Sequence, residues 1–287
     1  MNVAVLGLGI MGAGIASVLH SKGLLSAVYN RSAGKTGPFA ALGVRVGATP
    51  LEAATGADVV IAVLGDDEAS RTVWLGDHGA LAGMAVHAIA VEFSTLSPRW
   101  VHELNAAASA RNLDFLDAPM TGTKPHAASG QLRLFVGGDP AVLERARPAL
   151  AAVSTDQFYL GPTGSGATWK LVNNMMAAVH AAALAEGLAF AEAAGLNMEM
   201  VARLIPVSTT ASPMVTGKLP RMLAHDYSDT QFSLKWMAKD VSYALDLGGE
   251  LGVPLRTVEA AANLMSDALL KGYGDDDMAA MLEGLSE

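Results

Sequence analysis

The sequence predicts an α/β domain built on a mostly parallel sheet, followed by an all-α domain. Up to Leu160, short β-branched or apolar runs alternate with helical stretches, which is the pattern of successive βαβ units. After Gly161 and Pro162 the chain changes to long stretches of Ala, Leu and Met without strand signals. The domain boundary is therefore predicted there, giving domains over residues 1–162 and 163–287.

The strands and crossover helices of the first domain follow one another with short connections. Asp139 and Pro140 are expected as the cap and the first residue of the helix before the last strand. The predicted strands are Asn2–Leu6, Leu25–Tyr29, Val44–Val46, Asp58–Leu64, Val86–Val91, Phe115–Asp117, Leu132–Val136 and Gln157–Leu160. The other predicted helices of this domain are Met11–Lys22, Lys35–Leu42, Leu51–Thr55 and Glu68–Leu75.

A long helix, from about Ala167 to Ala194, is predicted to begin the second domain, because this segment has no Pro and only Gly187 inside it. Its length of ~40 Å exceeds the needs of a small domain. We expect it to join the two domains or to pack against a partner subunit. Further helices are predicted at Met198–Ile205, Leu234–Leu251 and Leu255–Lys271, and Asp275–Asp277 is interpreted as a solvated helix start without chemistry.

Composition excludes several classes of function. The formal net charge of −9 argues against a nucleic-acid-binding surface. With no cysteine and no histidine spacing typical of a metal site, we expect neither disulfides nor a bound metal. No apolar run is expected to reach the ~18 residues that cross a bilayer, so a cytoplasmic location without a membrane partner is predicted.

The segment from Gly7 to Gly12 follows a predicted strand directly and opens a predicted helix. In that context a G-x-G-x-x-G pattern allows a tight turn and brings backbone N–H groups close to a pyrophosphate. We therefore predict a Rossmann-type dinucleotide site, with cofactor contacts from Gly7, Gly9, Ile10, Met11 and Gly12.

The end of the second strand indicates which dinucleotide binds. NAD enzymes place a carboxylate there, whereas this chain has Asn30, Arg31 and Ser32, with Lys35 close behind. Residues 1–51 contain four Lys or Arg and no Asp or Glu, and cations at this position would pair with a 2′-phosphate. NADP is favoured over NAD; the alternative is that Arg31 stacks on adenine and both cofactors bind.

Two further segments could carry chemistry. Lys170 and Asn174 are four residues apart, so they share one helix face, and the helix start after Gly164 and Gly166 could hold a carboxylate with free N–H groups. A lysine with a suitable pKa can act as a proton donor and acceptor. The second segment comprises Thr121, Gly122, Thr123 and Lys124, which follow the end of a strand and could bind a substrate carboxylate or hydroxyl.

Four segments in this order resemble the β-hydroxyacid dehydrogenase family, which includes 3-hydroxyisobutyrate dehydrogenase and the glyoxylate/succinic semialdehyde reductases. The resemblance covers essentially the whole chain. Gly7–Gly12 match the G-L-G-x-M-G fingerprint, Asp117–Gly122 resemble the D-A-P-V-S-G motif, Gly164–Asn174 match G-x-G-x-x-x-K-x-x-x-N, and Lys239-Asp240 match a K-D motif.

The resemblance implies an NADP-dependent oxidoreductase acting on a small carboxylate-bearing hydroxy acid or its aldehyde or keto form. Lys170 would be the general acid/base, Asn174, Thr121 and Gly122 would orient the substrate, and Leu64, Thr95 and Lys239 would contact the cofactor. The site is expected between the domains, in a homodimer or homotetramer.

The chain departs from the family pattern at several positions. Thr121 stands where Ser is usual, Thr123 where a second Gly is usual, Gly65 where many members have Pro, and Glu92-Phe93 where many have Asp-Met. The Thr-Gly-Thr-Lys form resembles the semialdehyde reductase branch. Two rival functions are an imine reductase, whose proton donor is usually Asp or Tyr, and a non-catalytic NADP-binding scaffold, which would be expected to lose Lys170 or Asn174.

Overall fold

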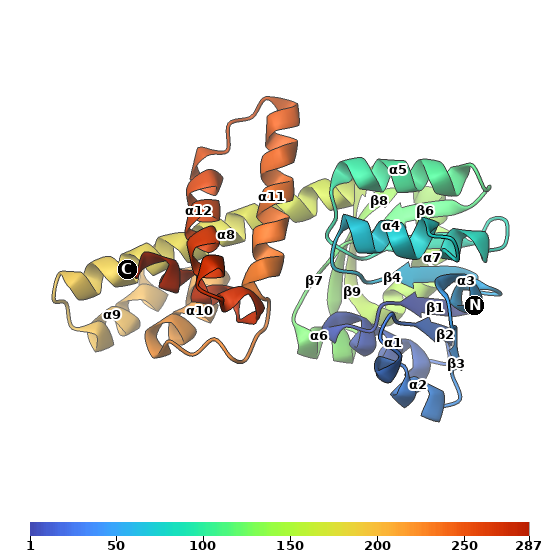
Figure 1. The fold of residues 1–287 in the computed structure, drawn as a ribbon, viewed down its shortest axis with the longest axis horizontal. Coiled ribbons are helices and arrows are strands. Elements are labelled where there is room, and N and C mark those ends of the chain that lie inside the picture. The colour runs from blue at the N-terminus through green and yellow to red at the C-terminus, as the bar shows by residue number, and fades with distance from the viewer. Residues whose placement is uncertain (287) are drawn as a thin grey trace. The chain divides into compact units, whose positions relative to one another are not determined.

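The computed structural model describes residues 1–286, which form two compact units, one over residues 1–170 and one from residue 171 onward. The division falls inside the long helix α8 (Ser165–Ala193). Strands occur in the first unit, and the second unit is helical (Figure 1). The predicted fold class, a Rossmann-type α/β domain followed by an all-α domain with a long helix joining them, is confirmed.

The first unit contains a nine-stranded sheet with the order β3-β2-β1-β4-β5-β6-β8-β7, and β9 lies beside β8. Strands β1 to β6 pair in parallel, β8 runs antiparallel to β6 and β7, and β9 is parallel to β8. The order 3-2-1-4-5-6 is that of dinucleotide-binding folds. The strands are β1 (Val3–Leu6), β2 (Leu25–Tyr29), β3 (Arg45–Val46), β4 (Val59–Ala62), β5 (Ile89–Glu92), β6 (Asp114–Asp117), β7 (Met120–Thr121), β8 (Leu132–Gly138) and β9 (Ser154–Gly161).

The helices of the first unit cover both faces of this sheet. They are α1 (Ile10–Ser21), α2 (Gly37–Ala41), α3 (Pro50–Ala54), α4 (Asp67–Leu75), α5 (Pro98–Ser109), α6 (Lys124–Ser129) and α7 (Pro140–Val153), with 3₁₀ turns η1 (Ala33–Lys35) and η2 (Ala80–Ala82). The structure adds β7, α5 and α6 to the predicted elements. The start of α5 carried a recognisable signal, because Ser97 precedes Pro98 and its hydroxyl accepts from the Trp100 N–H.

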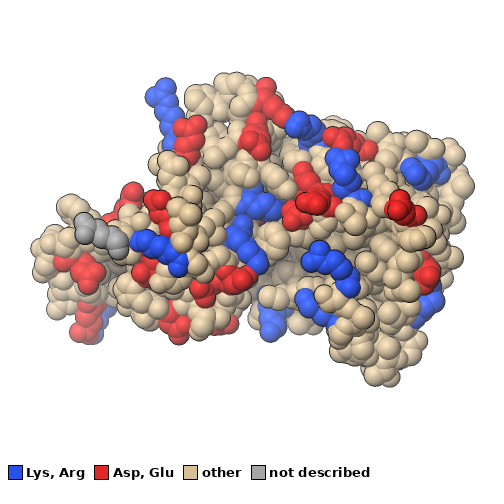
Figure 2. All heavy atoms as spheres, viewed as in Figure 1, with Lys and Arg blue, Asp and Glu red and all other residues tan. Residues whose placement is uncertain are grey.

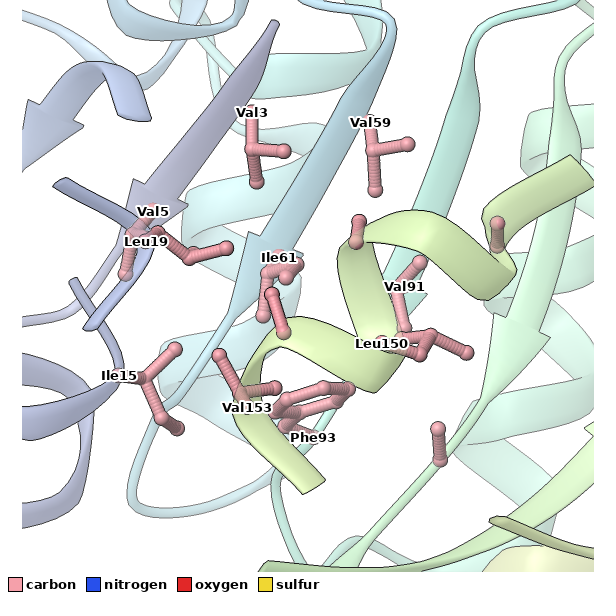
Figure 3. Packing of buried hydrophobic residues seen from close by; sticks show 14 of the residues in the cluster. Val3, Val5, Ile15, Leu19, Val59, Ile61, Val91, Phe93, Leu150 and Val153 are labelled. Carbon is pink, nitrogen blue, oxygen red and sulfur yellow. The ribbon is translucent and has the colours of Figure 1, made fainter. Parts of the chain in front are cut away.

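Alternate residues of the central strands point to opposite faces, so the sheet has a core on each side. Val5, Ile61 and Val91 pack with residues of α1 and α7, such as Ile15 and Leu150 (Figure 3). On the other face, alanines of the same strands lie against the helices that carry Trp74, Trp100 and Leu104. The strands are therefore apolar throughout, and polar residues occur where they end.

The second unit packs its helices around the second half of α8, whose Ala178, Ala181 and Ala185 are buried. Its other helices are α9 (Met198–Leu204), α10 (Pro213–Ala224), α11 (Leu234–Leu251) and α12 (Arg256–Leu270), with 3₁₀ segments η3 (Ile205–Val207), η4 (Tyr273–Asp275) and η5 (Met278–Leu285). Helix α10 was not predicted, because Gly217 and Pro220 interrupt its sequence pattern.

Asp277 corrects the interpretation of the acidic run before η5. It caps that segment, as expected for a helix start, but it is fully buried rather than solvated. Lys218 Nζ lies 2.7 and 2.9 Å from its two carboxylate oxygens. Backbone N–H groups of Gln231, Phe232 and Ala279 also donate to it. Asp277 is therefore a structural ion-pair partner inside the second unit.

Helix α8 bears on the expectation about apolar segments. By length and composition alone it could cross a membrane, and it is the one such helix found among the described residues. In its most apolar stretch 44% of the residues are buried within the molecule. A helix that forms the core of a folded unit meets the same test, so the finding does not by itself indicate a membrane span.

Candidate functional site

The glycine turn after β1 has the geometry that a bound pyrophosphate requires. Gly7 has φ +95°, and a Cβ atom on it would lie 2.2 Å from the Val63 carbonyl oxygen. A Cβ on Gly12 would lie 2.0 Å from the Gly7 carbonyl oxygen. Packing thus requires both glycines, whereas a Cβ on Gly9 would meet nothing within 4 Å. The open space at Gly9, where α1 begins without a side-chain cap or an acidic residue, fits an anionic ligand.

The loop after β2 is tied to this turn by Asn30. Its Oδ1 accepts from the Leu8 N–H at 2.8 Å, and its amide donates to the Ser32 carbonyl at 3.0 Å. Arg31, Ser32 and Lys35 are exposed beside it. Within residues 1–286, the side chains of Arg31 and Lys35 make no hydrogen bond or ion pair, so both cations are available to a ligand.

The other two basic residues among the first 51, Lys22 and Arg45, have different environments. Arg45 donates to the backbone carbonyls of Glu52, Ala53 and Thr55 at the end of α3. Lys22 follows the last residue of α1, at the opposite end of that helix from the glycine turn. On the face of the molecule in Figure 2, Lys and Arg side chains are scattered among Asp and Glu.

The residues that follow β4 contact the glycine turn, and the end of β5 lies beside them. We call the side of the sheet where β1, β4, β5 and β6 end the carboxyl edge; the strands end there at Leu6, Ala62, Glu92 and Asp117. Leu64 Cδ2 would lie 3.1 Å from a Cβ on Gly7, and the Leu64 N–H donates to Ser94 Oγ at 2.7 Å. Thr95 is partly buried next to it. The predicted cofactor residues Leu64 and Thr95 therefore follow strands that end at this edge.

A buried carboxylate holds the start of α8 at the carboxyl edge. Asp117 accepts from the N–H groups of Gly164 and Ala167, both at 2.8 Å. A Cβ on Gly166 would lie 2.2 Å from the Phe135 carbonyl oxygen and 2.9 Å from Asp117. This corrects the expectation that N–H groups at the helix start are free for a substrate carboxylate, because Asp117 uses two of them. Lys170 follows three residues after Ala167 and is partly buried.

Burial changes the ionisation of two carboxyl groups at this edge. It raises the pKa of Asp117 to about 6, although backbone N–H bonds from Gly164 and Ala167 act in the opposite direction. Burial also raises the pKa of Glu92 above its usual value, against the hydrogen bonds donated by Ser94, Trp74 and Ser70. Loss of water around the charged form is the dominant cause in both cases.

The segment from Thr121 to Lys124 leads from β7 into α6. Thr121 pairs with Arg133 of β8, and Gly122 has φ +145°. Thr123 contacts His126 through both its N–H and its hydroxyl, at 3.1 and 2.8 Å from Nδ1, and Lys124 is exposed at the first position of α6. Helix α6 packs closely on α1 because Gly14 has no side chain. A Cβ on Gly14 would lie only 3.0 Å from the backbone of Ala127.

In the second unit, Asn174 is buried and its amide donates to Asp240 Oδ2 at 2.6 Å. Lys239 Nζ lies 2.9 Å from Asp240 Oδ1, although the geometry is not that of a directed hydrogen bond. Lys239 also lies 4.8 Å from the centre of the Tyr243 ring. Asp240 therefore joins Asn174 and Lys239, two residues that sequence analysis had placed in separate motifs.

Sequence reasoning gave no role to Glu92, Asp117 or Asp240 as individual side chains. A signal was present for the first two, since Glu92 ends the otherwise apolar strand β5 and Asp117 follows the apolar pair Phe115 and Leu116 at the end of β6. Among residues 1–286, no group of three or more His, Asp or Glu side chains is arranged to hold a metal ion.

Comparison with known protein families assigns both units. Residues 2–161 match the family model described as the NAD binding domain of 6-phosphogluconate dehydrogenase. Residues 164–285 match the one described as NAD-binding of NADP-dependent 3-hydroxyisobutyrate dehydrogenase.

Individual proteins agree with these matches. The chain is 37% identical over 246 residues to an uncharacterised oxidoreductase of Shewanella frigidimarina, covering 85% of this chain and 84% of that protein. It is 32% identical to glyoxylate/succinic semialdehyde reductase 1 of Arabidopsis thaliana, covering 99% and 98%. The 3-hydroxyisobutyrate dehydrogenase structure of Mycobacterium tuberculosis has a TM-score of 0.90 at 29% identity, covering 100% and 99%. The chain therefore belongs to the β-hydroxyacid dehydrogenase family and is a nicotinamide-dinucleotide-dependent oxidoreductase.

Proposed function

We propose that this protein is an NADPH-dependent reductase of small aldehyde or keto acids, with Lys170 as the general acid, and that it catalyses the reverse oxidation with the same residue as base. The observation that carries the proposal is the anchoring of α8 by Asp117. Because of this contact, the helix that bears Lys170 begins at the same edge of the sheet as the glycine turn. Ligands of open α/β sheets bind at that edge.

The cofactor would be held by the glycine turn and the loop after β2. Gly7, Gly9 and Gly12, with Ile10 and Met11, would surround the pyrophosphate. The unpaired cations Arg31 and Lys35 favour NADP, because a guanidinium and an ammonium pair with the 2′-phosphate that NAD lacks. When bound, NADPH supplies the hydride; the protein supplies orientation and proton transfer.

Lys170 would donate a proton to the oxygen of the carbonyl group as it is reduced, and it would accept that proton in the oxidation. Asn174, one helical turn further along α8, would hydrogen-bond the substrate with the amide hydrogen that Asp240 does not use. Lys239, held by the same carboxylate, would contact the cofactor.

The substrate carboxylate would bind at the Thr121–Lys124 segment. Thr121 offers a hydroxyl, Gly122 an N–H and Lys124 a positive charge, whereas the Thr123 hydroxyl already contacts His126. The semialdehyde reductase relative supports a small carboxylic acid as the class of substrate. We also propose that the protein assembles as a homodimer or homotetramer.

A substrate panel tests the function. NADPH absorbance is followed with glyoxylate, succinic semialdehyde, methylmalonate semialdehyde and a cyclic imine, and we expect turnover of at least one of the three acids. Lys170→Ala is expected to lower that turnover by ~10²-fold or more, with NADPH affinity nearly unchanged. Turnover of the imine alone would indicate an imine reductase. NADPH binding without any turnover would indicate a scaffold, and an active Lys170→Ala variant would remove Lys170 from the mechanism.

Cofactor preference is tested separately with Arg31→Ala. Loss of one charge-assisted contact to the 2′-phosphate is expected to raise the KM for NADPH about tenfold or more while leaving the KM for NADH nearly unchanged. Lys22→Ala is the matched control, since it removes one exposed cation from the other end of α1 and should leave both constants unchanged. Equal effects of Arg31→Ala on NADPH and NADH would contradict an NADP-selective role.

A further inference from the structure

We propose that Glu92 is a positioning residue for the cofactor, which acts through Ser94 to fix the backbone after β4 beside the glycine turn. The inference rests on the proposed binding of NADPH at that turn. It concerns a position where this chain has Glu-Phe rather than the Asp-Met of many family members.

Glu92 is the last residue of β5 and is 1% exposed. Its Oε1 accepts from the N–H and the hydroxyl of Ser94, at 3.0 and 2.5 Å. Its Oε2 accepts from Ser70 Oγ at 2.7 Å and from Trp74 Nε1 at 2.8 Å. Each carboxylate oxygen therefore has its own pair of donors, and all four donors are neutral groups.

The Ser94 hydroxyl connects Glu92 to the end of β4. A hydroxyl has one proton, and at 2.5 Å that proton is directed to Glu92 Oε1. The oxygen must then present a lone pair elsewhere, and the Leu64 N–H donates to it at 2.7 Å. Glu92 thus determines which way the Ser94 hydroxyl points, and this orientation gives the Leu64 N–H its acceptor.

Leu64 and the residue before it form one wall of the glycine turn. A Cβ on Gly7 would lie 2.2 Å from the Val63 carbonyl oxygen and 3.1 Å from Leu64 Cδ2. The turn and the backbone at 63–64 are therefore in direct contact. A change in the acceptor of the Leu64 N–H would move this wall, and with it the N–H groups that would face the pyrophosphate of the proposed cofactor.

The two oxygens of Glu92 separate two roles. Oε1 accepts from Ser94, which contacts the backbone beside the glycine turn. Oε2 accepts from Ser70 and Trp74 of α4, which are fully buried in the core. Both serines are buried and each donates one hydroxyl hydrogen bond to the same carboxylate. The chain thus offers a matched pair of substitutions, Ser94→Ala and Ser70→Ala.

The test measures the Kd for NADPH and the Tm of the full-length wild type, Glu92→Gln, Ser94→Ala, Ser70→Ala and the double variant Glu92→Gln/Ser94→Ala. Glu92→Gln replaces an acceptor by an amide that must face N–H donors, and we expect its Kd to rise about tenfold. Ser94→Ala should raise the Kd by a similar factor. Ser70→Ala should lower the Tm but leave the Kd within about twofold of wild type.

The double variant separates positioning from additive effects. If Glu92 acts through Ser94, removing the Ser94 hydroxyl in the Glu92→Gln background should change the Kd by less than about twofold. Full additivity would overturn the proposal, and so would equal effects of Ser94→Ala and Ser70→Ala on the Kd. If Glu92→Gln fails to fold, the two serine variants still decide the question. Failure of the wild type to bind NADPH or NADH would overturn the proposed function as well, whereas wild-type binding with an unchanged Kd in Glu92→Gln would overturn this inference alone.

Discussion

Both units bury carboxylates, but they compensate the charge in different ways. In the first unit, Glu92 and Asp117 accept hydrogen bonds from neutral hydroxyl, indole and backbone groups. In the second unit, Asp277 and Asp240 lie 2.7 and 2.9 Å from lysine ammonium groups. All four carboxylates are at most 1% exposed, so burial itself is the same in the two units.

The difference follows from where the chain supplies donors. The carboxyl edge of the parallel sheet faces helix starts, whose N–H groups have no partner within the helix and carry partial positive charge. Asp117 uses two such groups in place of a cation. The residues of the second unit up to 286 form no sheet, and Asp277 and Asp240 pair with lysines of α10 and α11. The printed donors to Glu92 and Asp117 are therefore all neutral groups, whereas Asp277 and Asp240 each also lie next to a lysine ammonium group.

The largest expected effect is the loss of the buried ion pair in the second unit. Asp277→Ala leaves the Lys218 ammonium, whose side chain is 10% exposed, without its carboxylate. We expect a loss of about 3–5 kcal/mol in the free energy of unfolding, measured by urea titration. Asp275→Ala is the control, because Asp275 pairs with Lys235 at the surface and should contribute less than about 1 kcal/mol. Equal losses would show that burial of the pair is not what matters.

The next effect is a pH dependence that belongs to the first unit. Asp117 has a folded-state pKa of about 6, raised by burial from 3.8. Between these values the folded chain binds more protons than the unfolded chain. The contribution of Asp117 to the free energy of unfolding is therefore fully present below about pH 4 and is lost as the pH rises through about 6. The shift from 3.8 to about 6 means that the free energy of unfolding should be about 3 kcal/mol lower at neutral pH than below pH 4, as far as Asp117 is concerned.

Asp117→Asn tests this dependence, because asparagine keeps the size of the side chain and cannot ionise. The variant should be less stable than wild type, since its amide must face one of the two N–H donors. Its deficit should be largest near pH 4 and should shrink by up to about 3 kcal/mol toward pH 7. A deficit that is independent of pH over this range would mean that Asp117 titrates in its ordinary range. Turnover should also fall, because the same carboxylate anchors the start of α8.

Much of the fold could be predicted because its signals are local. Apolar runs of four or more residues marked the main strands, and β2 and α11 have the bounds that the sequence predicted. Strand β7 has only two residues, too few for a periodic pattern. Helices α6 and α10 contain or adjoin Gly and Pro, which sequence reasoning took as breaks.

The candidate site was less accessible to prediction because its contacts are long-range. The glycine turn is a local pattern, and its context was sufficient to predict a dinucleotide. The bond from Gly164 to Asp117 spans 47 positions and that from Asn174 to Asp240 spans 66. No spacing rule connects such residues, so the sequence placed Asp117 and Asp240 in family motifs but did not show that they hold Gly164 and Asn174.

The smallest expected effect is at Asp240, and it sharpens the contrast within the second unit. Asp240→Asn keeps an oxygen that can accept from the Asn174 amide, as Oδ2 does at 2.6 Å. It removes only the charge beside Lys239, whereas Asp277→Ala removes the charge beside Lys218 and also the acceptor of three backbone N–H groups. We therefore expect a loss of only about 1–2 kcal/mol in the free energy of unfolding. A loss as large as that of Asp277→Ala would mean that the two ion pairs contribute equally to the free energy of unfolding.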